Sequence, residues 1–225
     1  MAYAYELILF DLDGTLTDSA PGILESVTYA YQSLGLPIPS EAELATFVGP
    51  PLHVSAPNHG VPPELIKPFL MAYREKFVAG AMFNNSVYAG VRELLDALDT
   101  TGIPMGVATS KPEVFARQIL EHYELGHHFT FIAGATLDGV RSAKADVITH
   151  ALASLTDELG ELPQAQNIIM VGDREHDVLG AAAHSIATIG VRWGYAPEGE
   201  LHEAGAAYIV DTTEELLALL TQPKN

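Results

Sequence analysis

The sequence predicts a doubly wound, parallel α/β sheet that carries an inserted α-helical domain. Two observations predict this fold class: short apolar runs alternate with amphipathic helical stripes along most of the chain, and one interval near the N-terminus interrupts that alternation. The apolar runs are continuous, as expected for strands that are covered by helices on both faces. Repeated alternation of strand and helix favours parallel pairing through right-handed crossovers.

Six apolar runs are expected to form the strands. They are residues 7–10, 105–108, 131–133, 168–171, 186–189 and 208–210. Apolar stripes at helical spacing predict helices between them, most clearly over 91–98 and 147–155. The sequence Ser-Lys-Pro-Glu at 110–113 predicts a helix start with a capping box.

The interval from about residue 19 to residue 85 has a different pattern. It contains helical stripes and many prolines but no convincing strand. We therefore expect residues 1–18 and 86–225 to form the α/β core, and residues 19–85 to form an inserted helical domain.

Composition excludes several classes of function. Apolar residues make up 48% of the chain and charged residues 18%, which is typical of a globular protein. The net charge of -18 argues against nucleic acid as a partner, and no apolar stretch is long enough to cross a membrane. The first ten residues do not resemble a signal peptide and there is no cysteine, so we expect a soluble, cytoplasmic protein, either a monomer or a small homo-oligomer.

Polar residues follow the predicted strands at the edge where ligands bind in open α/β sheets. The segment Asp11–Ser19 follows the first strand, Thr109, Ser110 and Lys111 follow the second, and Gly172–Asp177 follows the fourth. Lys144 begins a predicted helix after the third strand. Acids, a hydroxyl group and an ammonium group should therefore converge on one edge of the sheet.

The residue types at this edge suggest metal-assisted chemistry. Asp11 and Asp13 are two residues apart, so in an extended chain their side chains point to the same side. Asp173 and Asp177 are four apart, which is expected to place them on one face of the first turn of a helix. Clustered carboxylates without cysteine fit Mg²⁺, and Lys144 can balance their charge.

Together these motifs resemble the haloacid dehalogenase superfamily, and in particular its phosphoglycolate-phosphatase-like branch. The aspartate pair of the pattern D-x-D-G-T is matched by residues 11–15. The other motifs are matched by Thr109 at a strand end, by Lys144 at a helix start and by the acidic motif of residues 172–177. The resemblance covers nearly the whole chain. It implies a Rossmann-like core with a helical cap that is inserted after the first motif.

The resemblance also implies roles for the residues. Asp11 would be the nucleophile, and Asp13 the general acid and then the general base. Asp11, Asp13, Asp173 and Asp177 would form or support the Mg²⁺ site, with Asp13 contributing its backbone carbonyl. Thr109 and Lys144 would hold the phosphoryl group, and Ser110, Gly49 and Arg74 are further candidates for substrate contact.

The implied function is magnesium-dependent hydrolysis of a small phosphomonoester metabolite, similar to phosphoglycolate, through a phospho-aspartate intermediate. A phosphomutase of the same superfamily is one alternative, and a signalling domain phosphorylated on aspartate is another. The nine histidines show no metal-ligand spacing, and we expect structural or surface roles for them. Packing is also the expected role of Trp193 and Tyr195, which lie in a loop after a strand.

Overall fold

The computed structural model describes residues 3–224, except for the side chains of residues 157–159. The chain divides into two compact units. Residues 17–86 form one unit, and residues 1–16 together with 87–225 form the other.

The larger unit is built on a six-stranded sheet in the order β5-β4-β1-β6-β7-β8. Its strands are β1 (Leu7–Phe10), β4 (Met105–Pro112), β5 (Phe131–Ala135), β6 (Ile168–Gly172), β7 (Ala187–Val191) and β8 (Tyr208–Val210). All neighbouring strands of this sheet pair in parallel. Each strand contains or overlaps one of the six predicted runs, and the predicted fold class is confirmed.

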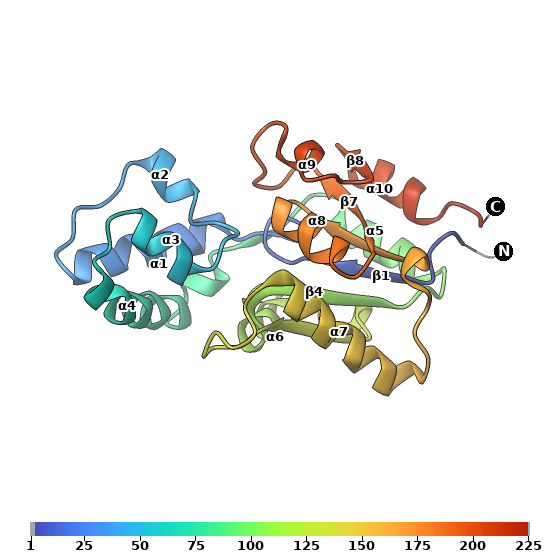
Figure 1. Cartoon of the computed structure of the whole chain (residues 1–225), viewed down its shortest axis with the longest axis horizontal. Helices are drawn as coiled ribbons and strands as arrows, with labels where there is room; N and C mark the ends of the chain where they lie inside the picture. The colour runs from blue at the N-terminus through green and yellow to red at the C-terminus, as the bar shows by residue number, and fades with distance from the viewer. Residues whose placement is uncertain (1–2, 225) are drawn as a thin grey trace. The chain divides into compact units, whose positions relative to one another are not determined.

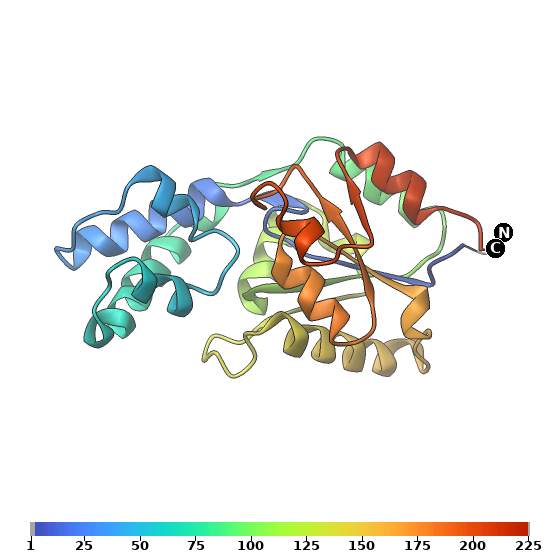
Figure 2. The same cartoon turned by 45° about the horizontal axis from the view of Figure 1, so that its top comes forward.

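Helices cover both faces of this sheet (Figures 1 and 2). They are α5 (Val91–Asp99), α6 (Glu113–His122), α7 (Lys144–Leu159), α8 (Glu175–Ala182), α9 (Glu200–Glu203) and α10 (Thr213–Leu220), with 3-10 turns η3 (Gly126–His128) and η4 (Ala165–Asn167). Apolar residues of α7 and α8 pack on Leu7 and Leu9 of β1 in one buried cluster. On the other face, Phe10 of β1 makes an edge-to-face contact with Phe129, with ring centroids 6.1 Å apart. The alternation of β1 side chains between two covered faces explains why the strand reads as a continuous apolar run.

Gly106 of β4 and Phe131 of β5 are partners in the strand register. A Cβ atom added at position 106 would overlap the ring of Phe131. The ring therefore occupies the space above the glycine, which fixes how these two strands pack side by side.

The smaller unit is helical. It contains α1 (Ala20–Ser33), α2 (Glu41–Ala45), α3 (Leu52–Asn58), η1 (Pro63–Leu65), α4 (Ile66–Val78) and η2 (Ala81–Phe83). Its core contains the rings of Tyr31, Phe47 and Phe69, and Tyr31 lies 5.1 Å from Phe69 between ring centroids. The chain enters and leaves the helical segment through two short strands, β2 (Thr17–Asp18) and β3 (Ser86–Val87), which pair with each other.

One local prediction is wrong. The strand β4 continues to Pro112, and Pro112 rather than Ser110 precedes the first turn of α6, without a side-chain cap. A register shift between Thr109 and Pro112 lets the strand continue through the residues that were expected to begin the helix. In the described part of the chain, none of the helices combines the length and apolar character needed to cross a membrane.

Candidate active site

The predicted site residues of the larger unit lie at the carboxyl ends of three neighbouring strands. Asp11 directly follows β1, Asp173 directly follows β6, and Thr109 lies near the end of β4. These segments end side by side because β1 lies between β4 and β6. Lys144 is the first residue of α7, as predicted.

Lys144 lies at the centre of a buried charge cluster. Its Nζ is 2.9 Å from Oδ1 of Asp11 and 2.6 Å from Oδ1 of Asp177, and it donates a hydrogen bond of 2.9 Å to the carbonyl of Ala108. Burial lowers the pKa of Lys144, but the negative charges of Asp11 and Asp177 outweigh it and hold the pKa above the ordinary value. Lys144 is therefore a fixed cation at neutral pH.

Asp11, Asp173 and Asp177 form a cluster of buried carboxylates. Their exposed fractions are 8%, 0% and 1%, and one oxygen of each lies within 4.8 Å of the others. Burial raises the pKa of Asp173 well above its usual value, and the charges of Asp177 and Asp11 raise it further. Burial also raises the pKa of Asp177, although Lys144 acts in the opposite direction. Burial is thus the main cause of both raised pKa values, and repulsion among the carboxylates adds to it.

The two acids of the fourth motif are placed differently from the prediction. α8 begins at Glu175, so Asp173 precedes the helix and only Asp177 lies in its first turn. Asp177 accepts a hydrogen bond of 3.1 Å from the backbone N–H of Arg174. The expectation that both acids share one face of a helical turn is therefore wrong, because the helix starts two residues later than the motif suggests. The two side chains still reach the same cluster.

Asp13 has a partner that the sequence did not reveal. Its Oδ2 lies 2.8 Å from Nζ of Lys111, whose side chain is 4% exposed. The backbone N–H of Lys111 donates a hydrogen bond of 3.2 Å to Oγ1 of Thr109. Lys111 is two residues after Thr109 in β4, a spacing that would place both side chains on the same side of a regular strand; the register shifts between Thr109 and Pro112 here. This spacing is the one sequence signal that could have identified Lys111.

The donor set fits a small divalent cation. Three carboxylates, of Asp11, Asp173 and Asp177, lie in one buried cluster with the ammonium group of Lys144. A divalent ion would bring this cluster to balance, because three negative charges would then meet one lysine and two charges of the ion. Oxygen ligands suit Mg²⁺, which binds at about 2.0–2.1 Å. The acidic cluster can therefore bind a metal ion.

The remaining predicted residues lie elsewhere in the chain. Ser110 is in β4 between Thr109 and Lys111 and is only partly buried. Gly49 and Arg74 belong to the helical unit: Gly49 has a φ of 103°, and Arg74 lies in α4. Their contact with substrate remains a prediction.

One histidine lies in a second group of acids. Nδ1 of His128 is 2.6 Å from Oδ2 of Asp99, and its Nε2 is 3.9 Å from Oδ1 of Asp96. The side chains of Asp96 and Asp99 are 74% and 45% exposed, while that of His128 is 4% exposed. Among the described residues this group joins α5 to η3, and one ligand atom of each residue lies within 4.8 Å of the others, a spacing that could hold a metal ion. The structural role expected for the histidines stays a prediction.

Comparison with known proteins agrees with this geometry. A sequence model of the family described as haloacid dehalogenase-like hydrolase matches residues 8–191. The chain therefore belongs to the haloacid dehalogenase-like hydrolases, as the motifs predicted.

Relatives within this family carry different names. The chain is 47% identical over 191 residues to the tyrosine-protein kinase PtkA of Mycobacterium tuberculosis, covering 84% of this chain but only 63% of PtkA. It is 43% identical over 201 residues to a 5'-nucleotidase of Pseudomonas aeruginosa, covering 89% of this chain and 88% of that protein. It is also 32% identical over 224 residues to a phosphoglycolate phosphatase of Pseudomonas savastanoi, covering 94% and 78%.

Among solved structures, the chain resembles a predicted phosphatase from Clostridium acetobutylicum. The TM-score is 0.87 at 43% identity, over 96% of this chain and 97% of that one. The family is one of hydrolases, as predicted, and two of these relatives carry names of phosphoric monoester hydrolases, a nucleotidase and a phosphatase.

Proposed function

We propose that this protein is a magnesium-dependent phosphatase that hydrolyses a small phosphomonoester through a phospho-aspartate on Asp11. The observation that carries the proposal is the buried cluster of Asp11, Asp173 and Asp177 around Lys144 at the carboxyl edge of the sheet. Buried acids at such an edge are costly unless a cation joins them. A site for phosphoryl transfer explains why the chain keeps these buried acids in spite of their cost in folding free energy.

In the first step Asp11 attacks phosphorus. A bond forms between its carboxylate oxygen and phosphorus as the bond from phosphorus to the leaving oxygen breaks. Asp13 gives its proton to that leaving oxygen, so the alcohol departs neutral. The products of this step are a phospho-aspartate on Asp11 and a deprotonated Asp13.

In the second step water attacks the phosphorus of the phospho-aspartate. Asp13 accepts the proton of the water, the bond from phosphorus to Asp11 breaks, and phosphate leaves with the Asp11 carboxylate restored. Asp13 is then protonated again for the next cycle.

The other residues hold charge in place. Thr109 and Lys144 would bind the oxygens of the transferring phosphoryl group, Thr109 as a hydroxyl donor and Lys144 as a cation. Asp11, Asp173 and the backbone carbonyl of Asp13 would hold Mg²⁺, with Asp177 in support. When bound, the ion would stabilise negative charge on the phosphoryl oxygens.

Two substrate classes are supported by different relatives. A phosphoglycolate-like metabolite is the leading candidate, because the resemblance of the motifs extends to that branch and a relative of that name aligns over 94% of this chain. A nucleoside 5'-monophosphate is the second, because the relative named 5'-nucleotidase is more similar, at 43% identity over nearly its whole length. We propose that the helical unit of residues 17–86 acts as a cap, with Gly49 and Arg74 contacting the substrate, in a cytoplasmic protein that is a monomer or a small homo-oligomer.

A panel of phosphomonoesters tests the proposal. Phosphate release is measured with Mg²⁺ for 2-phosphoglycolate, nucleoside 5'-monophosphates, sugar phosphates and a phosphotyrosine peptide, and substrates are ranked by kcat/KM. Sugar phosphates are also tested with a bisphosphate activator, which a phosphomutase would need. We expect a small metabolite to rank first, activity to vanish in excess chelator, and activity to return with Mg²⁺.

Matched variants separate the site from the fold. Asp11→Asn should abolish turnover, whereas Asp211→Asn, which changes an acid that is 60% exposed, should not. Full activity in chelator would refute the metal requirement. If the protein transferred phosphate from ATP to a tyrosine peptide and released no phosphate from any ester, the proposed phosphatase activity would be wrong. The protein would then have the tyrosine-kinase activity that the name of PtkA describes.

A further inference from the structure

A segment after β7 is hydrogen-bonded to the acid cluster through its backbone and to the loop after Asp13 through an indole ring. The backbone N–H of Tyr195 donates a hydrogen bond of 2.8 Å to Oδ2 of Asp173. The indole Nε1–H of Trp193 donates one of 3.0 Å to the carbonyl of Thr15, in the loop that follows Asp11 and Asp13. Two hydrogen bonds thus connect this segment to both acidic motifs of the site.

Gly194, between these two residues, is packed against Asp173. A Cβ atom added at Gly194 would overlap the side chain of Asp173 and the carbonyl of Gly14. A Cβ at Gly14 would overlap the same carboxylate. Gly194 does not have a positive φ, so lack of space and not a left-handed backbone excludes a side chain there. The Asp173 carboxylate is therefore packed against two glycines.

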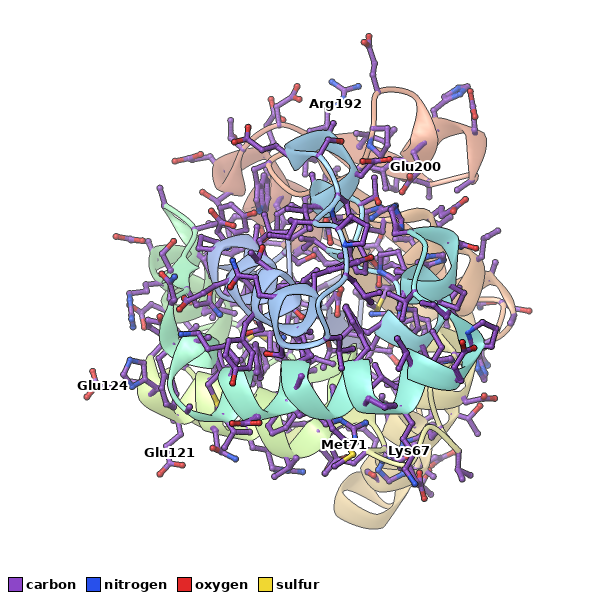
Figure 3. All side chains as sticks on the ribbon, turned by 90° about the vertical axis from the view of Figure 1, so that its left-hand side faces the viewer. Lys67, Met71, Glu121, Glu124, Arg192 and Glu200 are labelled. Carbon is purple, nitrogen blue, oxygen red and sulfur yellow. The ribbon has the colours of Figure 1, made fainter. Side chains whose placement is uncertain are left out.

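The far end of the segment is anchored beside Asp173 as well. Arg174 Nε and Nη2 donate hydrogen bonds of 2.7 and 3.2 Å to Oε1 and Oε2 of Glu200. Glu200 Oε1 also accepts a bond of 2.9 Å from the backbone N–H of Glu175. Residues 192–200, here called the strap, are thus tied to Thr15 through Trp193, and through Glu200 to Arg174 and Glu175, the two residues after the acid. Figure 3 labels the two ends of the strap, Arg192 and Glu200.

The contacts of Asp173 define its orientation. Oδ1 accepts a hydrogen bond of 3.3 Å from the hydroxyl of Thr15, and Oδ2 accepts the bond from Tyr195. Asp173 has no exposed surface, so these contacts lie inside the protein. The strap and the Asp11–Thr15 loop each supply one hydrogen bond to the carboxylate.

We propose that the strap, through Trp193, Gly194 and Tyr195, positions Asp173 and thereby sets the affinity of the acid cluster for its divalent metal ion. The inference rests on the proposed function, because it requires that the cluster binds such an ion. Groups that orient metal ligands from behind typically change metal affinity by about 10–100-fold when they are altered. The strap residues are positioning residues and need not touch substrate.

Binding of Mg²⁺, measured by isothermal titration calorimetry without substrate, tests the inference. Gly194→Ala should weaken Mg²⁺ binding about 10–100-fold. Gly126→Ala is the matched control: it makes the same change in η3, at a glycine that also lacks a positive φ and where the added Cβ would meet nothing within 4 Å. The control should bind Mg²⁺ with the affinity of the parent.

Trp193→Phe provides a second, milder variant if Gly194→Ala does not fold. It keeps a ring and removes only the indole N–H, so a loss of about 2–10-fold in Mg²⁺ affinity is expected from one hydrogen bond. Melting temperatures without metal are measured for all variants, because a purely structural role would lower stability and leave the Mg²⁺ affinity unchanged.

The outcomes distinguish the two proposals. If the parent binds no Mg²⁺, the proposed function fails. If the parent binds Mg²⁺ and both Gly194→Ala and Trp193→Phe bind it equally well, the proposed function stands and the role of the strap is overturned. If Gly194→Ala does not fold, the Mg²⁺ affinity of Trp193→Phe alone decides: a weakened affinity supports the role of the strap, and the affinity of the parent overturns it.

Discussion

Replacing Lys144 by methionine should destabilise the metal-free protein strongly. The Nζ of Lys144 lies within 2.9 Å of both Asp11 and Asp177, and the side chain is 3% exposed. Lys144→Met retains an unbranched apolar stem and removes the charge. Asp11, Asp173 and Asp177 would then be buried together with their main compensating cation lost.

The size of the effect follows from this burial. Removing one partner of a buried ion pair typically costs about 3–5 kcal/mol, because the other charge stays uncompensated. In a chain of this size each kcal/mol lowers Tm by about 2–4 °C, so Tm should fall by about 6–20 °C. Uptake of a proton by one of the acids, whose pKa would rise further, would move the result toward the lower end of this range.

Thermal unfolding in chelator and in saturating Mg²⁺ measures the effect. Lys224→Met is the control, since Lys224 pairs with Glu6 at 2.6 Å on the surface, where both side chains are more than 40% exposed; its Tm should hardly change. Mg²⁺ should raise the Tm of Lys144→Met more than that of the parent. Adding Asp177→Asn to Lys144→Met should restore part of the lost stability, because it removes an uncompensated charge. If Lys144→Met and Lys224→Met melt at the same temperature in chelator, the account of the charge cluster is wrong.

Three further predictions concern the acids and Lys111. With a nitrophenyl phosphate, which needs little acid assistance, Asp13→Asn should give a burst and then turnover slowed by about 10²–10⁴-fold. If the phosphate of this ester is radiolabelled, the label should remain on Asp11 of Asp13→Asn after the reaction is quenched. An Asp13→Asn protein that carries no label would contradict the roles assigned to these acids. Lys111→Met should reduce kcat/KM most for esters with poor leaving groups, because the lysine holds the acid that protonates them; an equal loss for good and poor leaving groups would count against this. Because the pKa of Asp173 is raised in the folded state, the folded metal-free protein binds a proton that the unfolded chain releases near pH 4. In chelator, the Tm should therefore fall as the pH rises through the raised pKa of Asp173. Bound Mg²⁺, or the change Asp173→Asn, should weaken this dependence of Tm on pH. A Tm that rises with pH in that range would refute the prediction.

The sequence predicted the sheet well because its strands are buried on both faces. Leu7–Phe10 of β1 and residues 168–171 of β6 are apolar without interruption, so a short run is sufficient to identify each of these two strands. The start of α6 was misplaced because Ser-Lys-Pro-Glu satisfies the local rules for a helix start, whereas the pairing of β4 with β5 extends the strand through it. The local sequence shows only a preference for starting a helix at Ser110, and the pairing of β4 with β5 determines that the strand continues to Pro112.

The sequence predicts those site residues whose side chains would carry out the chemistry. Asp11, Lys144, Asp173 and Asp177 follow strands or begin a helix, and the topology brings them together. Lys111 was not assigned a role, because a lysine near a strand end looks like a surface residue until its distant partner is known. The sequence predicts only packing for Trp193 and Tyr195, because the N–H of Tyr195 is a backbone group and carries no signature in the sequence.

The packing of Phe131 over Gly106 has a consequence for related sequences. The two residues face each other across adjacent strands, and the ring fills the volume that a side chain at 106 would need. A change at one position should therefore be accompanied by a change at the other during evolution: homologues with a larger residue at 106 should carry a smaller one at 131. The pair should stand out as a correlated substitution in an alignment of the family, although it lies in the structural core and takes no part in catalysis.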